Sequence, residues 1–183
     1  MKTIEIEIDG ILYIKSGKYW YAEDAIGIVP PDSIMKKILK KELESHDLKS
    51  MTIFELQEFI KITREIEHYD FCLEAVEQLL DLVTEKNDTI LLRNCMSIKV
   101  SCLRKLKRSS EAIEFCKAMK ELYSDDIRNV NTLTSLAAAY CDIEDWDTAK
   151  KVCDHAYKKQ GGSVGYTNEL SMVYKRIAAK SDS

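Results

Sequence analysis

The chain has 183 residues, of which 45% are hydrophobic and 32% are charged, and its 31 acidic and 27 basic side chains give a formal net charge of -4. This length allows one domain, or one domain with a small appendage, and the composition excludes a disordered or fibrous chain. The net negative charge argues against a surface built as a whole to hold nucleic acid.

The positions of glycine and proline divide the chain. The six glycines lie at positions 10, 17, 27, 161, 162 and 165 and the two prolines at 30 and 31, so residues 32–160 contain neither. Because these residues are the strongest breakers of regular structure, segment 32–160 is predicted to be mostly helical. The chain is expected to divide at Pro30-Pro31.

Before the prolines, the sequence predicts a three-stranded antiparallel β-meander. Isoleucines alternate with acidic residues over 4–8, and Asp9-Gly10 forms a hairpin turn before the apolar run 11–14. A second break at Ser16-Gly17 precedes the aromatic run 19–21.

The turn lengths set the expected strand register. Two-residue loops pair Ile8 with Ile11 and pair Tyr13 with both Ile6 and Trp20. The face predicted to be buried carries Ile4, Ile6, Ile8, Ile11, Tyr13 and Trp20. Because so small a sheet cannot stand alone, a helix over 32–45 is expected to cover it, which gives an N-terminal unit of residues 1–46.

From residue 50 onwards, apolar residues recur with helical periodicity. Thr52 and Glu55 form a capping box ahead of a helix that runs to about His68. Six further helices are predicted to begin at or near Asp70, Asp88 or Thr89, Ser109 or Ser110, Leu133, Trp146 and Leu170. The helix that contains Trp146 is expected to end at Gly161-Gly162.

The segment LTSLAAAYCDIEDWDTAKKVCDHA, residues 133–156, resembles a tetratricopeptide repeat. Its matching positions are Leu136, Ala137, Tyr140, Trp146, Ala149 and Ala156, and Cys153 stands where the family usually has an aromatic residue. Weaker copies occur around Ala112 and Tyr69. The intervals from Tyr69 to Ser109 to Trp146, 40 and 37 residues, exceed the family's period of about 34, so a neighbouring class of helical-hairpin repeat is the alternative.

The resemblance covers roughly residues 50–180 and implies a mainly α protein. We expect a short α-solenoid of three degenerate tetratricopeptide-like hairpins with a C-terminal capping helix over residues 50–183. The small N-terminal antiparallel three-stranded β-meander is not covered by the resemblance.

Motifs for nucleotide binding are absent from the sequence, and so is the zinc-binding motif HExxH. GxGxxG and GxxxxGK[ST] do not occur, and residues 32–160 have no glycine from which to build a phosphate-binding loop. Six cysteines without a CxxC pair are interpreted as reduced core thiols: Cys72, Cys95, Cys102, Cys116, Cys141 and Cys153. The three histidines, His46, His68 and His155, are interpreted as solvated or helix-capping residues. We expect no catalytic residue, no metal site and no cofactor.

The sequence also carries signals about location. It contains neither a run of 18 apolar residues nor a basic N-terminal segment followed by an apolar one. Together with the unpaired cysteines, this predicts a cytoplasmic protein that does not bind a membrane.

Three surfaces are candidates for binding. The resemblance implies a concave groove along the first helix of each hairpin, where the non-core residues include Gln57, Lys61, Arg64, Arg93, Asn94, Lys99, Asn131 and Ser135. Two basic clusters are Lys36, Lys37, Lys40 and Lys41, and Arg104, Lys105, Lys107 and Arg108. A sheet patch consists of Tyr19 and Tyr21 with Leu12 and Ile14. Each surface has a plain alternative: a solvated helix for the first two, and cover by the chain's own helix for the third.

The function predicted from these features is that of a non-enzymatic protein–protein interaction module, an adaptor or inhibitor that binds a partner protein or peptide through the helical repeats. The alternative is a nucleic-acid-binding protein that uses the Lys36–Lys41 helix face and the Arg104–Arg108 cluster.

Overall fold

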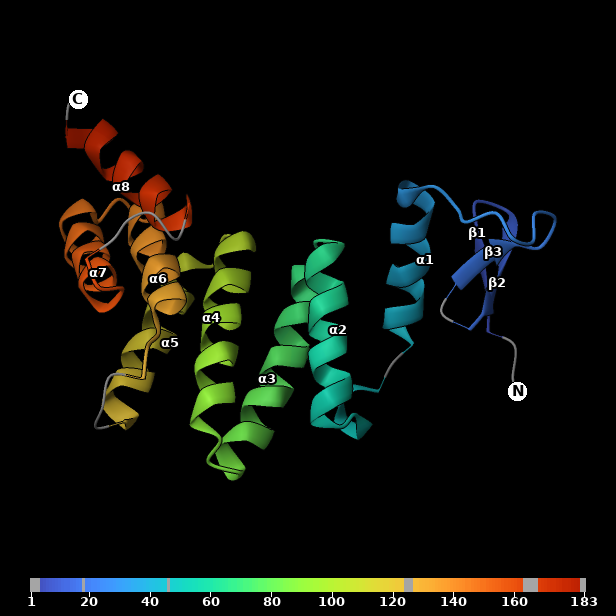
Figure 1. The fold of residues 1–183 in the computed structure, drawn as a ribbon, viewed down its shortest axis with the longest axis horizontal. Coiled ribbons are helices and arrows are strands. Elements are labelled where there is room, and N and C mark those ends of the chain that lie inside the picture. Colours follow the sequence, from blue (N-terminus) through green and yellow to red (C-terminus); the bar gives the residue numbers. More distant parts are fainter. Residues whose placement is uncertain (1–3, 18, 46, 124–126, 163–167, 182–183) are drawn as a thin grey trace.

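The structure is a computed structural model, and it describes residues 4–17, 19–45, 47–123, 127–162 and 168–181. Figure 1 shows an elongated molecule with the N-terminal sheet at one end and the C-terminal helices at the other. The described part contains three strands and eight α-helices, so the protein is mainly α with a small antiparallel sheet.

The sheet is a meander of β1 (Glu5–Ile8), β2 (Ile11–Ser16) and β3 (Tyr19–Ala22). The first hairpin has the predicted register, in which Ile8 pairs with Ile11. In the second hairpin Tyr13 pairs with Ala22 and Trp20 with Lys15, so the predicted pairing of Tyr13 with Trp20 is wrong. The loop starts at Gly17, because β2 continues through Ser16. The shift is two residues, which leaves Trp20 and Tyr13 on the same face.

Helix α1 (Asp32–Glu44) covers part of one face of the sheet. Its Ile38 packs with Ile8, Tyr13 and Trp20, and all four side chains are buried. Two residues that were expected on the buried face, Ile4 and Ile11, are 47% and 46% exposed. One helix of 13 residues covers only part of the face, and these two isoleucines lie outside the buried cluster.

Polar contacts also fix α1 to the sheet. Glu42 forms an ion pair with Lys15 and accepts a hydrogen bond from Trp20 Nε1 at 3.3 Å. Lys41 Nζ donates to the backbone carbonyl of Glu7 at 2.8 Å, on the edge strand β1. At the other end of α1, Leu43 belongs to the core of the helical repeats, so α1 contacts both parts of the molecule.

The remaining helices pack mostly against their neighbours along the chain, as Figure 1 shows. A short 3-10 helix, η1 (Leu48–Ser50), precedes them and contacts the second of them. Their bounds are α2 Ile53–Glu65, α3 Tyr69–Glu85, α4 Thr89–Lys105, α5 Ser109–Leu122, α6 Val130–Asp142, α7 Trp146–Lys159 and α8 Asn168–Ser181.

The helix starts follow the local capping chemistry. The predicted capping box is present: Glu55 N–H donates to Thr52 Oγ1, and the Glu55 carboxylate accepts from the Thr52 N–H at 2.7 Å. Asp88 caps α4 by accepting from two backbone N–H groups. Asp70, near which this helix was predicted to begin, is not its cap, because α3 begins at Tyr69 and Asp70 lies within its first turn.

Four helix ends are closed by a residue other than glycine in the left-handed conformation. These residues are Glu67, Asn87, Lys107 and Glu144, with φ between 54° and 62°. In each turn the following N–H donates to the carbonyl five residues earlier, at 2.7–3.2 Å, which satisfies a carbonyl at the helix end. Gly161 has the same role after α7, as its position in the sequence predicted.

The sixth helix is the most enclosed element. Residues 132–139 are buried without interruption, and α6 contacts α4, α5, α7 and α8. Small side chains permit this enclosure: Ala137 on α6 and Ala149 on α7 are both fully buried. Both are positions at which residues 133–156 match the tetratricopeptide pattern.

Candidate protein-binding groove

A groove of about 740 Å³ lies between α2 and α4. Its apolar lining comes from α2, α3 and α4 and consists of Ile60, Leu79, Leu91, Cys95 and Ile98. Leu79 is 1% exposed and belongs to the main core, so the base of the groove is part of the folded scaffold. The groove therefore offers an apolar base that the packing of the helices holds in place.

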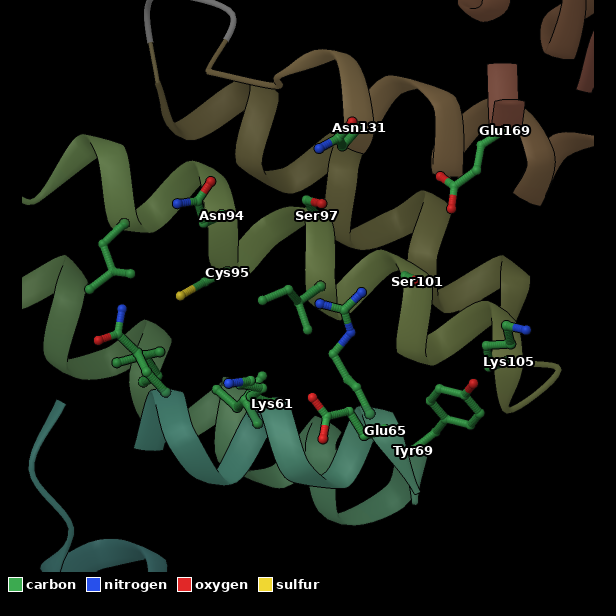
Figure 2. Close-up of a pocket in the computed structure, with 16 residues that line it drawn as sticks. Lys61, Glu65, Tyr69, Asn94, Cys95, Ser97, Ser101, Lys105, Asn131 and Glu169 are labelled. Carbon is green, nitrogen blue, oxygen red and sulfur yellow. The ribbon is translucent and has the colours of Figure 1, made fainter. Parts of the chain in front are cut away.

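The rim of the groove is polar. Figure 2 shows Lys61 and Glu65 on α2 opposite Asn94 and Ser97 on α4. Asn131 of α6 and Glu169 of α8 also reach the groove. At one end, Lys105 Nζ lies 5.7 Å from the centre of the Tyr69 ring, a cation–π contact.

Five of the eight residues that the sequence predicted for the binding surface line this groove: Gln57, Lys61, Arg64, Asn94 and Asn131. All five are exposed. The structure thus brings side chains from the first helices of three successive hairpins, α2, α4 and α6, to one groove.

The other three predicted residues lie elsewhere. Ser135 was expected to be a non-core residue but is only 9% exposed, because α6 is enclosed by its neighbours. Lys99 Nζ is 2.8 Å from Glu77 of α3 and 4.7 Å from the Phe115 ring centre, outside the groove. Arg93 is exposed but is not part of the groove lining.

Several groove residues were missed by the sequence analysis. On α4, Asn94 is followed by Ser97, Ser101 and Lys105 at steps of three, four and four residues, which is the spacing of one helix face. This spacing was available in the sequence as a signal. Tyr69 and Glu169 had no such signal, because their place in the groove depends on how separate helices pack.

The lysine face of α1 is largely engaged in contacts within the chain. Lys37 pairs with Asp9, Lys41 donates to the Glu7 carbonyl, and Lys40 Nζ lies 4.0 Å from Glu44. These contacts reduce the positive charge that the face offers to a phosphate.

The basic cluster 104–108 does not form one patch. Arg104 Nε donates to Asp142 on α6 at 3.0 Å, Arg108 pairs with Glu111 on α5, and Lys105 lines the groove. The side chains therefore serve separate contacts.

In the sheet patch, Tyr19 is 47% exposed and its ring centre lies 6.4 Å from that of Tyr21.

Asp142 is the centre of a polar cluster that joins four helices. It accepts hydrogen bonds from Arg104 of α4 at 3.0 Å, from Ser109 of α5 at 2.9 Å and from Arg176 of α8 at 2.9 Å. Burial by itself raises the pKa of Asp142, but the hydrogen bonds from the two arginines outweigh it and hold this pKa below its ordinary value. Asp142 is therefore ionised at neutral pH and links the C-terminal helices.

The cysteines and histidines are placed as follows. All six cysteines are free and buried. Burial raises the pKa of the Cys95 thiol to about 11 and that of Cys153 to about 12. Among the described residues there is no group of three or more His, Cys, Asp or Glu side chains that could hold a metal ion. His155 is exposed on α7, His68 precedes α3, and His46 lies outside the described residues.

The structure of this chain is similar to a solved structure, the NMR structure of the first TPR domain of the human RPAP3 protein. The TM-score is 0.51 at 18% sequence identity, and the match covers 72% of this chain and 96% of the RPAP3 domain. The fold is tetratricopeptide-like. No protein-family model matches the sequence, and neither does any curated protein.

At 18% identity this similarity establishes the fold, an α-solenoid of stacked helical hairpins. Within the part of the chain that the structure describes, no helix has the length and apolar character needed to cross a membrane.

Proposed function

We propose that this protein is a non-enzymatic adaptor or inhibitor that binds an extended segment of a partner protein in the groove between α2 and α4. The observation that carries the proposal is the combination of a buried apolar base with an exposed polar rim in one hollow of about 740 Å³. This volume falls in the range of about 300–1,000 Å³ that is typical of ligand-binding clefts.

The lining defines the chemistry of the partner segment. An apolar side chain of the partner packs against Leu91 and Ile98, the aliphatic residues of the lining that are partly exposed. The amide groups of Asn94 and Asn131 both donate and accept hydrogen bonds, so they suit the backbone of an extended chain. Lys61, Arg64 and Lys105 outnumber the two acids of the rim, Glu65 and Glu169, which favours acidic or hydrogen-bond-accepting groups in the partner.

The setting that we propose is a reducing compartment, the cytoplasm, because all six cysteines are free thiols. In this setting the protein acts by occupying a surface of its partner. It connects the partner to other proteins as an adaptor, or blocks a competing interaction as an inhibitor.

The test compares three charge-reversal variants in capture from the native host, followed by a binding measurement with the captured partner. The groove variant is Lys61→Glu with Arg64→Glu, and its matched control is Lys150→Glu with Lys151→Glu on the exposed surface of α7. The third variant reverses Lys36, Lys37, Lys40 and Lys41 on α1. Circular dichroism checks that each variant is folded.

We expect the groove variant to lose the partner and the two other variants to retain it. Partner binding that survives in the groove variant would contradict the proposal. If only the α1 variant loses binding, and binding also falls steeply with salt, the ligand is a nucleic acid and the groove is not the site.

A further inference from the structure

Two buried cysteines face each other across the packed helices α3 and α4. The Sγ atoms of Cys72 and Cys102 lie 3.3 Å apart, and the two residues are 30 positions apart in the sequence. Cys72 is 0% exposed and Cys102 is 1% exposed. A disulfide bond of about 2.05 Å requires the two sulfur atoms to approach by little more than about 1 Å.

We infer that Cys72 and Cys102 form a redox-active pair that a peroxide converts into a disulfide, which joins α3 to α4 beneath the groove. The inference rests on the geometry of the pair and does not depend on which partner the groove binds. It assigns to these two thiols a role beyond filling space in the core.

The pair is chemically asymmetric. The Cys102 thiol donates a hydrogen bond to Cys72 Sγ, and this bond lowers the pKa of Cys72 against the opposing effect of burial. Thr63 and the positive charge of Arg64 lower it further. The same contact and burial raise the pKa of Cys102. Cys72 is therefore the more acidic thiol of the pair and the attacking group, and Cys102 is the thiol that resolves the product.

The reaction balances in two steps. The Cys72 thiolate attacks one oxygen of hydrogen peroxide, the O–O bond breaks, and Cys72 becomes a sulfenic acid while hydroxide leaves. Cys102 then attacks the sulfenic sulfur. The S–S bond forms, the S–O bond breaks, and the thiol proton of Cys102 combines with the leaving hydroxide as water. The hydroxide from the first step takes up the proton that Cys72 lost on ionising, so two thiols are oxidised in total and one peroxide is reduced to two waters.

The position of the pair connects it to the groove. Cys72 lies seven residues before Leu79 on α3, and Cys102 lies seven residues after Cys95 on α4, so each is about two helical turns from a residue of the groove lining. Because a disulfide fixes the two helices to each other, it also restricts movement between the parts of the base that they supply.

The other thiols provide an internal comparison. Cys95 and Cys153 are as deeply buried as Cys72, but burial raises the pKa of each thiol to about 11 and about 12, respectively. Both therefore stay protonated at neutral pH and react slowly with peroxide. Oxidation is expected to select the 72–102 pair.

The experiment treats the wild-type chain of 183 residues with hydrogen peroxide at neutral pH, followed by acid quenching and mass spectrometry. We expect the intact protein to lose the mass of two hydrogen atoms, a single disulfide between the peptides that contain Cys72 and Cys102, and four thiols that can be alkylated after denaturation. The thermal midpoint should rise by roughly 5–10 °C, since the bond closes a loop of about 30 residues, and dithiothreitol should reverse the rise.

Two variants sharpen the result. Cys102→Ala removes the resolving thiol, so Cys72 should accumulate as a sulfenic acid that dimedone traps. Cys153→Ala removes an equally buried thiol outside the pair and should form the disulfide as the wild type does. A wild-type protein that keeps six thiols after peroxide treatment, or that forms a disulfide with any other cysteine, would overturn the inference.

Discussion

The left-handed residues at four helix ends predict that glycine substitution stabilises this protein. Glu67, Lys107 and Glu144 have φ values of 60–62°, and all three are exposed. The hydrogen bonds that close these turns come from backbone groups, so they survive removal of the side chain. The perturbation is the triple variant Glu67→Gly, Lys107→Gly and Glu144→Gly.

The magnitude follows from two opposing effects. An L-residue in the left-handed conformation costs roughly 1–2 kcal/mol, whereas glycine increases the entropy of the unfolded chain by an equivalent of roughly 0.5–1 kcal/mol. Each replacement should therefore raise the free energy of unfolding by roughly 0.5–1 kcal/mol. The triple variant gains about 1.5–3 kcal/mol, which raises the thermal midpoint by roughly 3–12 °C for a protein of this size. Asn87 should gain less, because asparagine tolerates this conformation.

The assay is urea unfolding of the wild type, the triple variant and a reciprocal control. Gly161 also has positive φ, and a Cβ added there meets no heavy atom within 4 Å. Gly161→Ala should therefore lower stability through backbone strain alone. The reasoning is refuted if the triple variant is no more stable than the wild type while Gly161→Ala behaves as expected, since the turns would then carry no strain to relieve.

Further predictions concern packing and charge. Ala149→Leu should overpack the α6–α7 contact and lower the free energy of unfolding by roughly 1–3 kcal/mol, so an unchanged thermal midpoint would contradict this assignment. Asp142→Asn should cost about 1–2 kcal/mol at pH 7. Because the pKa of Asp142 is lowered on folding, the stability that this carboxylate contributes is present at neutral pH and is lost as the pH falls below about 4, so variant and wild type should converge there in acid unfolding. Trp20→Ala should cost about 3–5 kcal/mol and speed hydrogen exchange in β1–β3 but not in α4.

The features that were predicted correctly depend on residues close together in the sequence. The box of Thr52 and Glu55 and the Asp9-Gly10 turn each fix a backbone conformation within four residues. The sequence allows two short loops in the second hairpin, one that begins at Ser16 and one that begins at Gly17. It does not choose between them, and this is why the second hairpin was paired wrongly.

The differences between the predicted binding surface and the groove lining come from contacts between distant elements. Helical periodicity placed Lys99 and Ser135 correctly within α4 and α6. It does not say which neighbour covers each face. Ser135 is buried because α6 is surrounded by four helices, and Lys99 is directed to Glu77 because α3 passes beside it. Both outcomes are decided by tertiary packing.

The enclosure of α6 has a consequence for how the protein unfolds. In a repeat array each unit touches only its two neighbours, and α6 follows this rule: α7 is the second helix of its own hairpin, α4 and α5 form the preceding hairpin, and α8 follows. Because α6 is buried without interruption over residues 132–139, removing any one of these helices exposes part of it. The C-terminal half should consequently melt as one cooperative block, and partial opening is expected first at the N-terminal end, where α1 meets the repeats mainly through Leu43.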